Sequence, residues 1–169
     1  MTIHFSKETG IGKVLLNWWE GLEDDRAGRA VLRRASSITA VTLTPPYQRL
    51  YRRLLTVGWE EKAKPYQNDR LAAIVGVLAY VEQNDDRTPA KAMSQKGVGE
   101  DRPPVSELRF MRLLESPDLD SLFTGLRRAL PLAKHSVDVL VLANDVVHWG
   151  DAVKKRWAYA YEWPDKSKS

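Results

Sequence analysis

The chain has 169 residues, a formal net charge of +4 and no cysteine. This length is enough to bury a hydrophobic core, and the absence of cysteine excludes disulfides, thiolate metal sites and thiol redox chemistry. No run of about 18 apolar residues occurs, and the N-terminal residues lack the charged and then apolar pattern of a secretion signal. We therefore expect a cytoplasmic protein without a membrane segment.

Apolar residues at helical spacing dominate the first half of the chain. We predict helices over residues 7–23, 25–36 and 45–57, the last of them capped by Thr44 and begun by two prolines. The β-branched stretch at residues 38–44 is the one strand candidate. Residues 71–83 are apolar nearly all round, which predicts a buried core helix.

Residues 85–104 contain Asp, Pro, Gly, Ser, Gln and Lys with very few apolar side chains. Such a composition predicts a mobile loop or linker. The loop divides an N-terminal helical half, residues 1–84, from a C-terminal helical half, residues 105–169. We predict an all-α helical bundle in which these two halves pack together as one compact domain.

Three helices are predicted in the second half. Ser106 and Ser116 are the predicted caps of the first two. The last and longest helix is predicted to start after Ser136 and to end before Pro164. In the helix that follows Ser106, one face carries the arginines and another carries Leu108, Met111 and Leu114.

Basic residues recur along the predicted helices. Between Arg26 and Arg53 there are seven arginines and no acidic residue, and Arg26, Arg29 and Arg33 project from one side of a helix. A single basic stripe is usually only a solvated helix face. Because five helices carry paired or tripled basic residues, we favour a surface that binds phosphate backbone without reading bases.

Candidate catalytic groups are few. Asp145, His148 and Asp151 follow one another at three-residue intervals on one predicted helix, and three such groups could bind a metal ion. A hydrogen-bonded surface histidine explains the same spacing, and no second histidine supports a ligand role. The glycines at 10–12 and 97–99 lack the strand and turn of a phosphate loop. We predict no catalytic residue, no metal and no cofactor.

Three stretches of the chain, GRAVLRRA (28–35), VSELRFMRLL (105–114) and LANDVVHWGDAVKKRWAYAY (142–161), resemble the CasB family, the small subunit of the type I-E CRISPR Cascade surveillance complex. The resemblance implies a non-catalytic α-helical protein, present in two copies beside the crRNA-bearing backbone and the large subunit. Its implied task is to hold crRNA, target DNA and the displaced strand, so that the R-loop stays open.

By position, the resemblance also implies a nucleic-acid-binding patch made of Arg33, Arg34, Arg109, Arg112, Arg127, Arg128, Lys154, Lys155 and Arg156. A second set, for which a solvated face is almost as good an explanation, comprises Arg49, Arg52, Arg53, Lys62 and Lys64. Charge reversal at Arg33, Arg34, Arg127 and Arg128 is expected to weaken strand holding without unfolding the protein, because these positions lie off the apolar stripes.

Two aromatic residues near the C-terminus, Trp157 and Tyr159, could stack on exposed bases. Packing is the better explanation, because Trp157 shares a helical face with Val153. The alternative function is a helical adaptor whose basic faces dock on acidic partner proteins, which exposed apolar patches would favour. A third hypothesis is an enzyme that uses the trio around His148, and metal analysis of the purified protein tests it.

Overall fold

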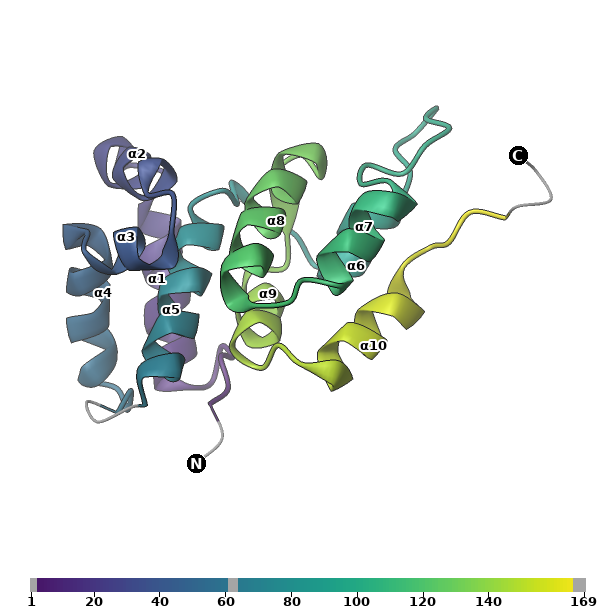
Figure 1. Ribbon diagram of the computed structural model, residues 1–169. Coiled ribbons are helices and arrows are strands. Elements are labelled where there is room, and N and C mark those ends of the chain that lie inside the picture. Colours follow the sequence, from purple (N-terminus) through teal and green to yellow (C-terminus); the bar gives the residue numbers. More distant parts are fainter. Residues whose placement is uncertain (1–2, 61–63, 166–169) are drawn as a thin grey trace.

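The computed structural model describes residues 3–60 and 64–165, which form ten α-helices and two short strands (Figure 1). The helices are α1 (Gly10–Gly21), α2 (Arg26–Arg34), α3 (Ile38–Thr42), α4 (Pro45–Leu55), α5 (Pro65–Leu78), α6 (Pro89–Ser94), α7 (Glu107–Leu114), α8 (Leu119–Leu132), α9 (Val139–Val147) and α10 (Asp151–Ala160). The strands β1 (Gln83–Asn84) and β2 (Ser136–Val137) pair in parallel. The predicted all-α class is confirmed. No helix in the described ranges is long and apolar enough to cross a bilayer.

Side-chain caps set the start of several helices. Thr44, Ser106 and Asp118 each accept a hydrogen bond from the backbone N–H three residues later, at the starts of α4, α7 and α8. Each bond satisfies an N–H group that has no partner within its helix. The predicted caps Thr44 and Ser106 are confirmed, whereas α8 is capped by Asp118 and not by Ser116.

Helix α5 forms the centre of the molecule. Its residues from Leu71 to Leu78 are all buried, as predicted, and it packs against α3, α8 and α9. Gly76 permits this close packing. A Cβ atom there would lie 2.5 Å from Cε2 of Phe123 on α8 and 3.0 Å from Cγ2 of Val41 on α3. A side chain at position 76 would therefore force the Phe123 ring, or α5 itself, to shift.

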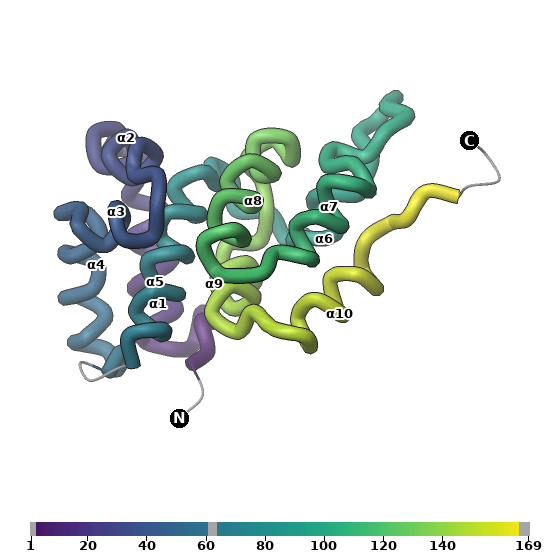
Figure 2. The backbone as a smooth tube through the Cα atoms, viewed as in Figure 1, coloured from purple at the N-terminus to yellow at the C-terminus, as the bar shows by residue number. Residues whose placement is uncertain are grey.

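Helices α8 and α9 lie beside α5, and most of the other helices lie on two sides of these three. Helices α2, α3 and α4 lie on one side of α5, α8 and α9, and α6, α7 and α10 lie on the other (Figure 2). One continuous hydrophobic cluster extends from Phe5 to Tyr161 and includes residues of all of these helices. The two predicted halves of the chain thus share a core.

Two predicted elements differ from the structure. The strand candidate at residues 38–44 is the short helix α3, because Ser37 caps it and the buried Ile38 and Val41 lie on one helical face against α5. The predicted long C-terminal helix is divided into α9 and α10. The break falls before α10, where Gly150 has an extended backbone with φ 175° and ψ −170°.

The predicted loop at residues 85–104 also differs. It contains α6, whose Ala90, Ala92 and Met93 are buried, so the expectation of an unstructured segment is wrong at Pro89–Ser94. Small side chains let this helix pack against α8 and α10 although the segment has little apolar character overall. Residues 95–104 form no helix or strand, and their mobility stays a prediction.

Candidate nucleic-acid interface

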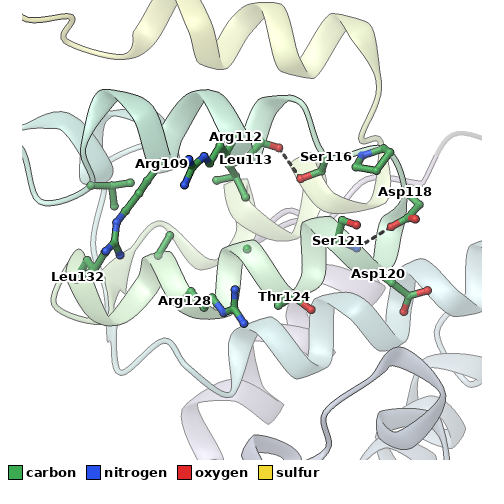
Figure 3. Close-up of a pocket in the computed structure, with 14 residues that line it drawn as sticks. Arg109, Arg112, Leu113, Ser116, Asp118, Asp120, Ser121, Thr124, Arg128 and Leu132 are labelled. Atoms are coloured by element: carbon green, nitrogen blue, oxygen red, sulfur yellow. Dashed lines mark hydrogen bonds between the residues drawn. The ribbon is translucent and has the colours of Figure 1, made fainter.

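A groove between α7 and α8 brings together three of the predicted site residues, Arg109, Arg112 and Arg128 (Figure 3). Its volume is about 790 Å³. All three side chains are exposed, and their guanidinium groups have no hydrogen-bond or ion-pair partner in the described part of the chain. Arg109 extends from α7 toward Leu132 near the end of α8. The groove therefore presents three unneutralised cations from two helices.

The rest of the groove has an apolar base and an acidic end. Leu113, Ala129 and Leu132 supply apolar surface, and Asp118 and Asp120 lie at the end formed by the start of α8. Hydrogen bonds from Ser121 lower the pKa of Asp118, which keeps that carboxylate ionised. An anion is consequently favoured at the arginine end of the groove and repelled at the other end.

Arg127, the neighbour of Arg128 on α8, lies on a different face of the helix and is buried. Its guanidinium stacks on the rings of Tyr80 and Phe123, at 4.6 Å from each centroid. It also donates hydrogen bonds to three backbone carbonyl oxygens at the end of α2, those of Leu32, Arg33 and Ala35. This geometry contradicts the prediction that Arg127 contacts phosphate, because its N–H donors already bond the backbone carbonyl oxygens at the end of α2.

The basic stripe of α2 faces the end of α5. Arg29 donates to the carbonyl oxygen of Val81 at 3.3 Å, and Nε of Arg33 donates to that of Ala79 at 2.8 Å. Arg33 also forms an ion pair with Glu82 at 3.1 Å, and this hydrogen bond lowers the pKa of Glu82. Arg33 is thus partly neutralised and half-buried, and its contact with nucleic acid stays a prediction.

Arg70 on α5 has the same kind of role and was not singled out from the sequence. Its guanidinium donates to the carbonyl oxygens of Val147 and Trp149, at 2.9 and 3.0 Å, where α9 ends. A cation there is favoured both by the free carbonyls and by the helix dipole. We call Arg29, Arg33, Arg70 and Arg127 the capping arginines.

Arg156 on α10 pairs with a buried carboxylate. One oxygen of Asp145 accepts from Arg156 at 2.9 Å and the other accepts from Nε1 of Trp157 at 2.8 Å. These bonds join α9 to α10 across the break between them. Although the Arg156 side chain is 55% exposed, its charge is compensated by this partner. It therefore differs from Arg109, Arg112 and Arg128, which we call the groove arginines.

The remaining predicted residues are spread over the surface. Arg34 and Lys155 are exposed and Lys154 is half-buried, and none of the three lines the groove. In the second set, the exposed residues are Arg49, Arg52, Arg53 and Lys64, of which Arg53 donates to Asn17 Oδ1 at 2.9 Å. Lys62 lies outside the described residues. These positions all stay predictions as nucleic-acid contacts.

The trio considered as a metal site has other partners. Both carboxylate oxygens of Asp145 accept hydrogen bonds, from Arg156 and Trp157. Nε2 of His148 lies 2.6 Å from the carbonyl oxygen of Ile3. Asp151 is the exposed first residue of α10. Within residues 3–60 and 64–165, no group of three or more His, Asp or Glu side chains is arranged to hold a metal ion.

Comparisons with known proteins agree with the resemblance stated above. Residues 28–161 match the family described as CRISPR-associated protein Cse2 (CRISPR_cse2). The three stretches that resemble CasB all lie within this range, and Cse2 and CasB are two names for the same small subunit. Comparison with curated protein sequences gives no match.

A solved structure has the same fold. A chain in the crystal structure of E. coli Cascade bound to a PAM-containing dsDNA target superposes with a TM-score of 0.67 and 22% sequence identity. The likeness covers 88% of this chain and 92% of that chain. At this identity it establishes the shared fold, while the family match covers most of the sequence. The chain belongs to the CRISPR-associated protein Cse2 family.

Proposed function

We propose that this protein is a non-catalytic subunit of a Cascade-type CRISPR surveillance complex, in which it holds nucleic-acid backbone. Membership of the Cse2 family and the fold shared with a chain of DNA-bound Cascade support this proposal. The proposed partners are crRNA, target DNA with its displaced strand, the crRNA-bearing backbone and large subunits, and a second copy of this chain. Surveillance of DNA inside the cell implies a cytoplasmic location.

The observation that carries the proposal is the groove between α7 and α8. Arg109, Arg112 and Arg128 are exposed and unneutralised, and a guanidinium group binds phosphate oxygens through paired N–H donors. Contacts of this kind do not depend on base sequence. Strand exchange replaces one duplex by another of similar stability, so a few added backbone contacts are enough to favour the open R-loop.

The test is binding of labelled DNA across a salt series by the full chain and by a triple variant, Arg109→Glu, Arg112→Glu and Arg128→Glu. Each phosphate contact contributes about 0.9 to the slope of log K against log salt, so we expect the slope to fall by about 3 in this variant. Its helical circular dichroism should match that of the wild type, because all three side chains are exposed.

The matched control is a second triple variant, Lys7→Glu, Lys13→Glu and Arg26→Glu, which changes the net charge equally at exposed positions outside the groove. We expect this control to keep most of the wild-type salt slope. An equal loss in both variants would contradict a specific role for the groove and would indicate a general charge effect.

The alternative function, an adaptor for protein partners, is favoured by one observation. Leu108 and Met111, predicted on an apolar face of α7, are 58% and 42% exposed, because Phe110 and Leu113 form the buried face instead. If docking on proteins were the main role, Leu108→Ser with Met111→Ser would prevent incorporation into the complex, and the triple groove variant would leave R-loop stability unchanged.

A further inference from the structure

Tyr159 on α10 differs from the other aromatic residues near it. Its side chain is 92% exposed, and no aromatic ring in the described part of the chain contacts it. The surrounding rings pack on one another instead: Trp157 lies 4.8 Å from Trp149, and Tyr161 lies 4.2 Å from Phe110, between ring centroids. The hydrophobic core therefore accounts for its neighbours but not for Tyr159.

The helical surface beside Tyr159 carries positive charge. Lys155 lies four residues earlier, on the same side of α10, and is exposed without a partner in the described part of the chain. Arg156, three residues earlier, is held by Asp145, so its charge is compensated but its position is fixed. A free cation thus lies one helical turn from an uncovered aromatic ring.

A second ring lies close to the same turn. Nε1 of Trp163 donates to the carbonyl oxygen of Ala158 at 2.7 Å, so the indole folds back over the end of α10. Trp163 is 40% exposed, and its inner edge packs against Phe110. The end of α10 therefore offers one fully exposed ring and one partly exposed ring, both placed by a helix that is anchored to α9.

We infer that Tyr159 stacks on an unpaired base of single-stranded nucleic acid while Lys155 neutralises a phosphate beside that base. This inference rests on the proposed function and deepens it, because it names the class of strand that one part of the surface selects. Stacking on an aromatic side chain tolerates any base but needs a base that is not already stacked in a duplex. The groove arginines are proposed to contact only phosphates, which single strands and duplexes both expose, so they do not require an unstacked base.

The chemistry around Tyr159 favours nucleic acid over a protein partner. A protein interface needs a sizeable continuous surface with an apolar centre. Here one fully exposed ring, with Trp163 only partly exposed beside it, is flanked along the helix by Lys155 and Arg156 and followed by Glu162, all three of which are exposed. An aromatic ring next to free positive charge is instead the combination by which proteins hold single strands without sequence preference.

The inference is tested with the full chain and two single strands of equal length, an oligothymidine and the same strand with abasic sites in place of its bases. Both carry the same phosphates, so the ratio of their affinities reports base stacking alone. We expect Tyr159→Ala to weaken oligothymidine binding about tenfold and to leave abasic binding unchanged. Tyr159→Phe, which keeps the ring, should bind as the wild type does.

Tyr66→Ala is the matched control, since Tyr66 is also an exposed tyrosine, on α5, and should leave both affinities unchanged. If Tyr159→Ala changes neither affinity, or lowers both equally, the stacking inference is overturned. In that case the salt slope and its dependence on the groove arginines would still support the proposed function. Absence of wild-type binding to either strand, even at low salt, would overturn both.

Discussion

The capping arginines and the groove arginines have the same chemistry but opposite surroundings. Arg127 is buried and bonds three carbonyl groups at the end of α2, whereas Arg109, Arg112 and Arg128 are exposed and unneutralised. What separates the two groups is the presence of a helix C-terminus within reach, not their spacing in the sequence. A basic stripe on a helix is therefore as consistent with holding neighbouring helix ends as with binding phosphate.

Adjacent residues on α8 provide the sharpest form of this comparison. Successive helical residues are turned by about 100°, which sends Arg127 into the junction of α2, α5 and α8 and leaves Arg128 at the groove. The sequence alone predicts that charge reversal at both positions leaves the fold intact. The structure changes this expectation for Arg127, where charge reversal should destabilise the fold.

The largest expected effect on stability belongs to Arg127→Met. Methionine fills similar space but leaves the carbonyl of Ala35 without a donor. The carbonyls of Leu32 and Arg33 keep one donor each, the Ala35 N–H and the Tyr80 hydroxyl. We expect the loss of the buried guanidinium and its bonds to cost about 3 kcal/mol of the free energy of unfolding. For a chain of this size the melting temperature should fall by roughly 6–12 °C, measured by circular dichroism. Arg34→Met, at an exposed position of the same helix end, is the control. An unchanged Tm in the Arg127 variant would refute the capping role.

A smaller loss is expected for Arg156→Ala. It leaves the buried Asp145 carboxylate with Trp157 as its remaining donor, and because Arg156 is itself half exposed we expect a cost of about 2 kcal/mol. Urea unfolding measures it, with Lys155→Ala as the control on the same helix. If both variants unfold at the same urea concentration as the wild type, Arg156 belongs with the exposed cations and not with the paired ones.

The smallest effect concerns acid. The hydrogen bond from Arg87 lowers the pKa of Asp85 from 3.8 to about 2. A carboxylate whose pKa is lower in the folded state stabilises the protein above the unfolded pKa, and this contribution is lost as pH falls from about 4 to about 2. Because the pair is partly exposed, we expect less than about 1 kcal/mol.

The acid effect is measured as the difference in unfolding free energy between wild type and Asp85→Asn at several pH values. The difference should be largest above about pH 4 and should shrink toward pH 2, because the variant cannot titrate at this position. Asp86→Asn, at the exposed neighbour, is the control. A difference that stays constant with pH would show that the Asp85 carboxylate contributes no ion pairing.

Much of the fold could be predicted because its signals are local. The caps at Thr44 and Ser106 and the uniformly apolar run in α5 are properties of a few neighbouring residues. The strand candidate at 38–44 was wrong because β-branched residues favour strands only weakly, and a cap at Ser37 with packing on α5 decided otherwise. The break between α9 and α10 depends on an extended Gly150, which the apolar pattern does not reveal.

The site could be predicted only in part, for a related reason. The grouping of Arg109, Arg112 and Arg128 depends on α7 packing against α8, and the burial of Arg127 depends on where α2 ends. Neither contact can be predicted from the residues adjacent in the sequence. The same holds for α7, where Phe110 and Leu113 rather than Leu108 and Met111 face the core. Side-chain type could be read from the sequence, but the partner of each side chain could not.

The two groups of arginines are separated most directly by comparing Arg127→Gln with Arg128→Gln, with thermal unfolding and DNA affinity both measured, the latter well below the melting temperature. We predict that Arg127→Gln lowers the melting temperature and keeps the wild-type affinity, whereas Arg128→Gln keeps the melting temperature and weakens binding. A folded Arg127→Gln protein that loses as much affinity as Arg128→Gln would contradict the division between capping and groove arginines.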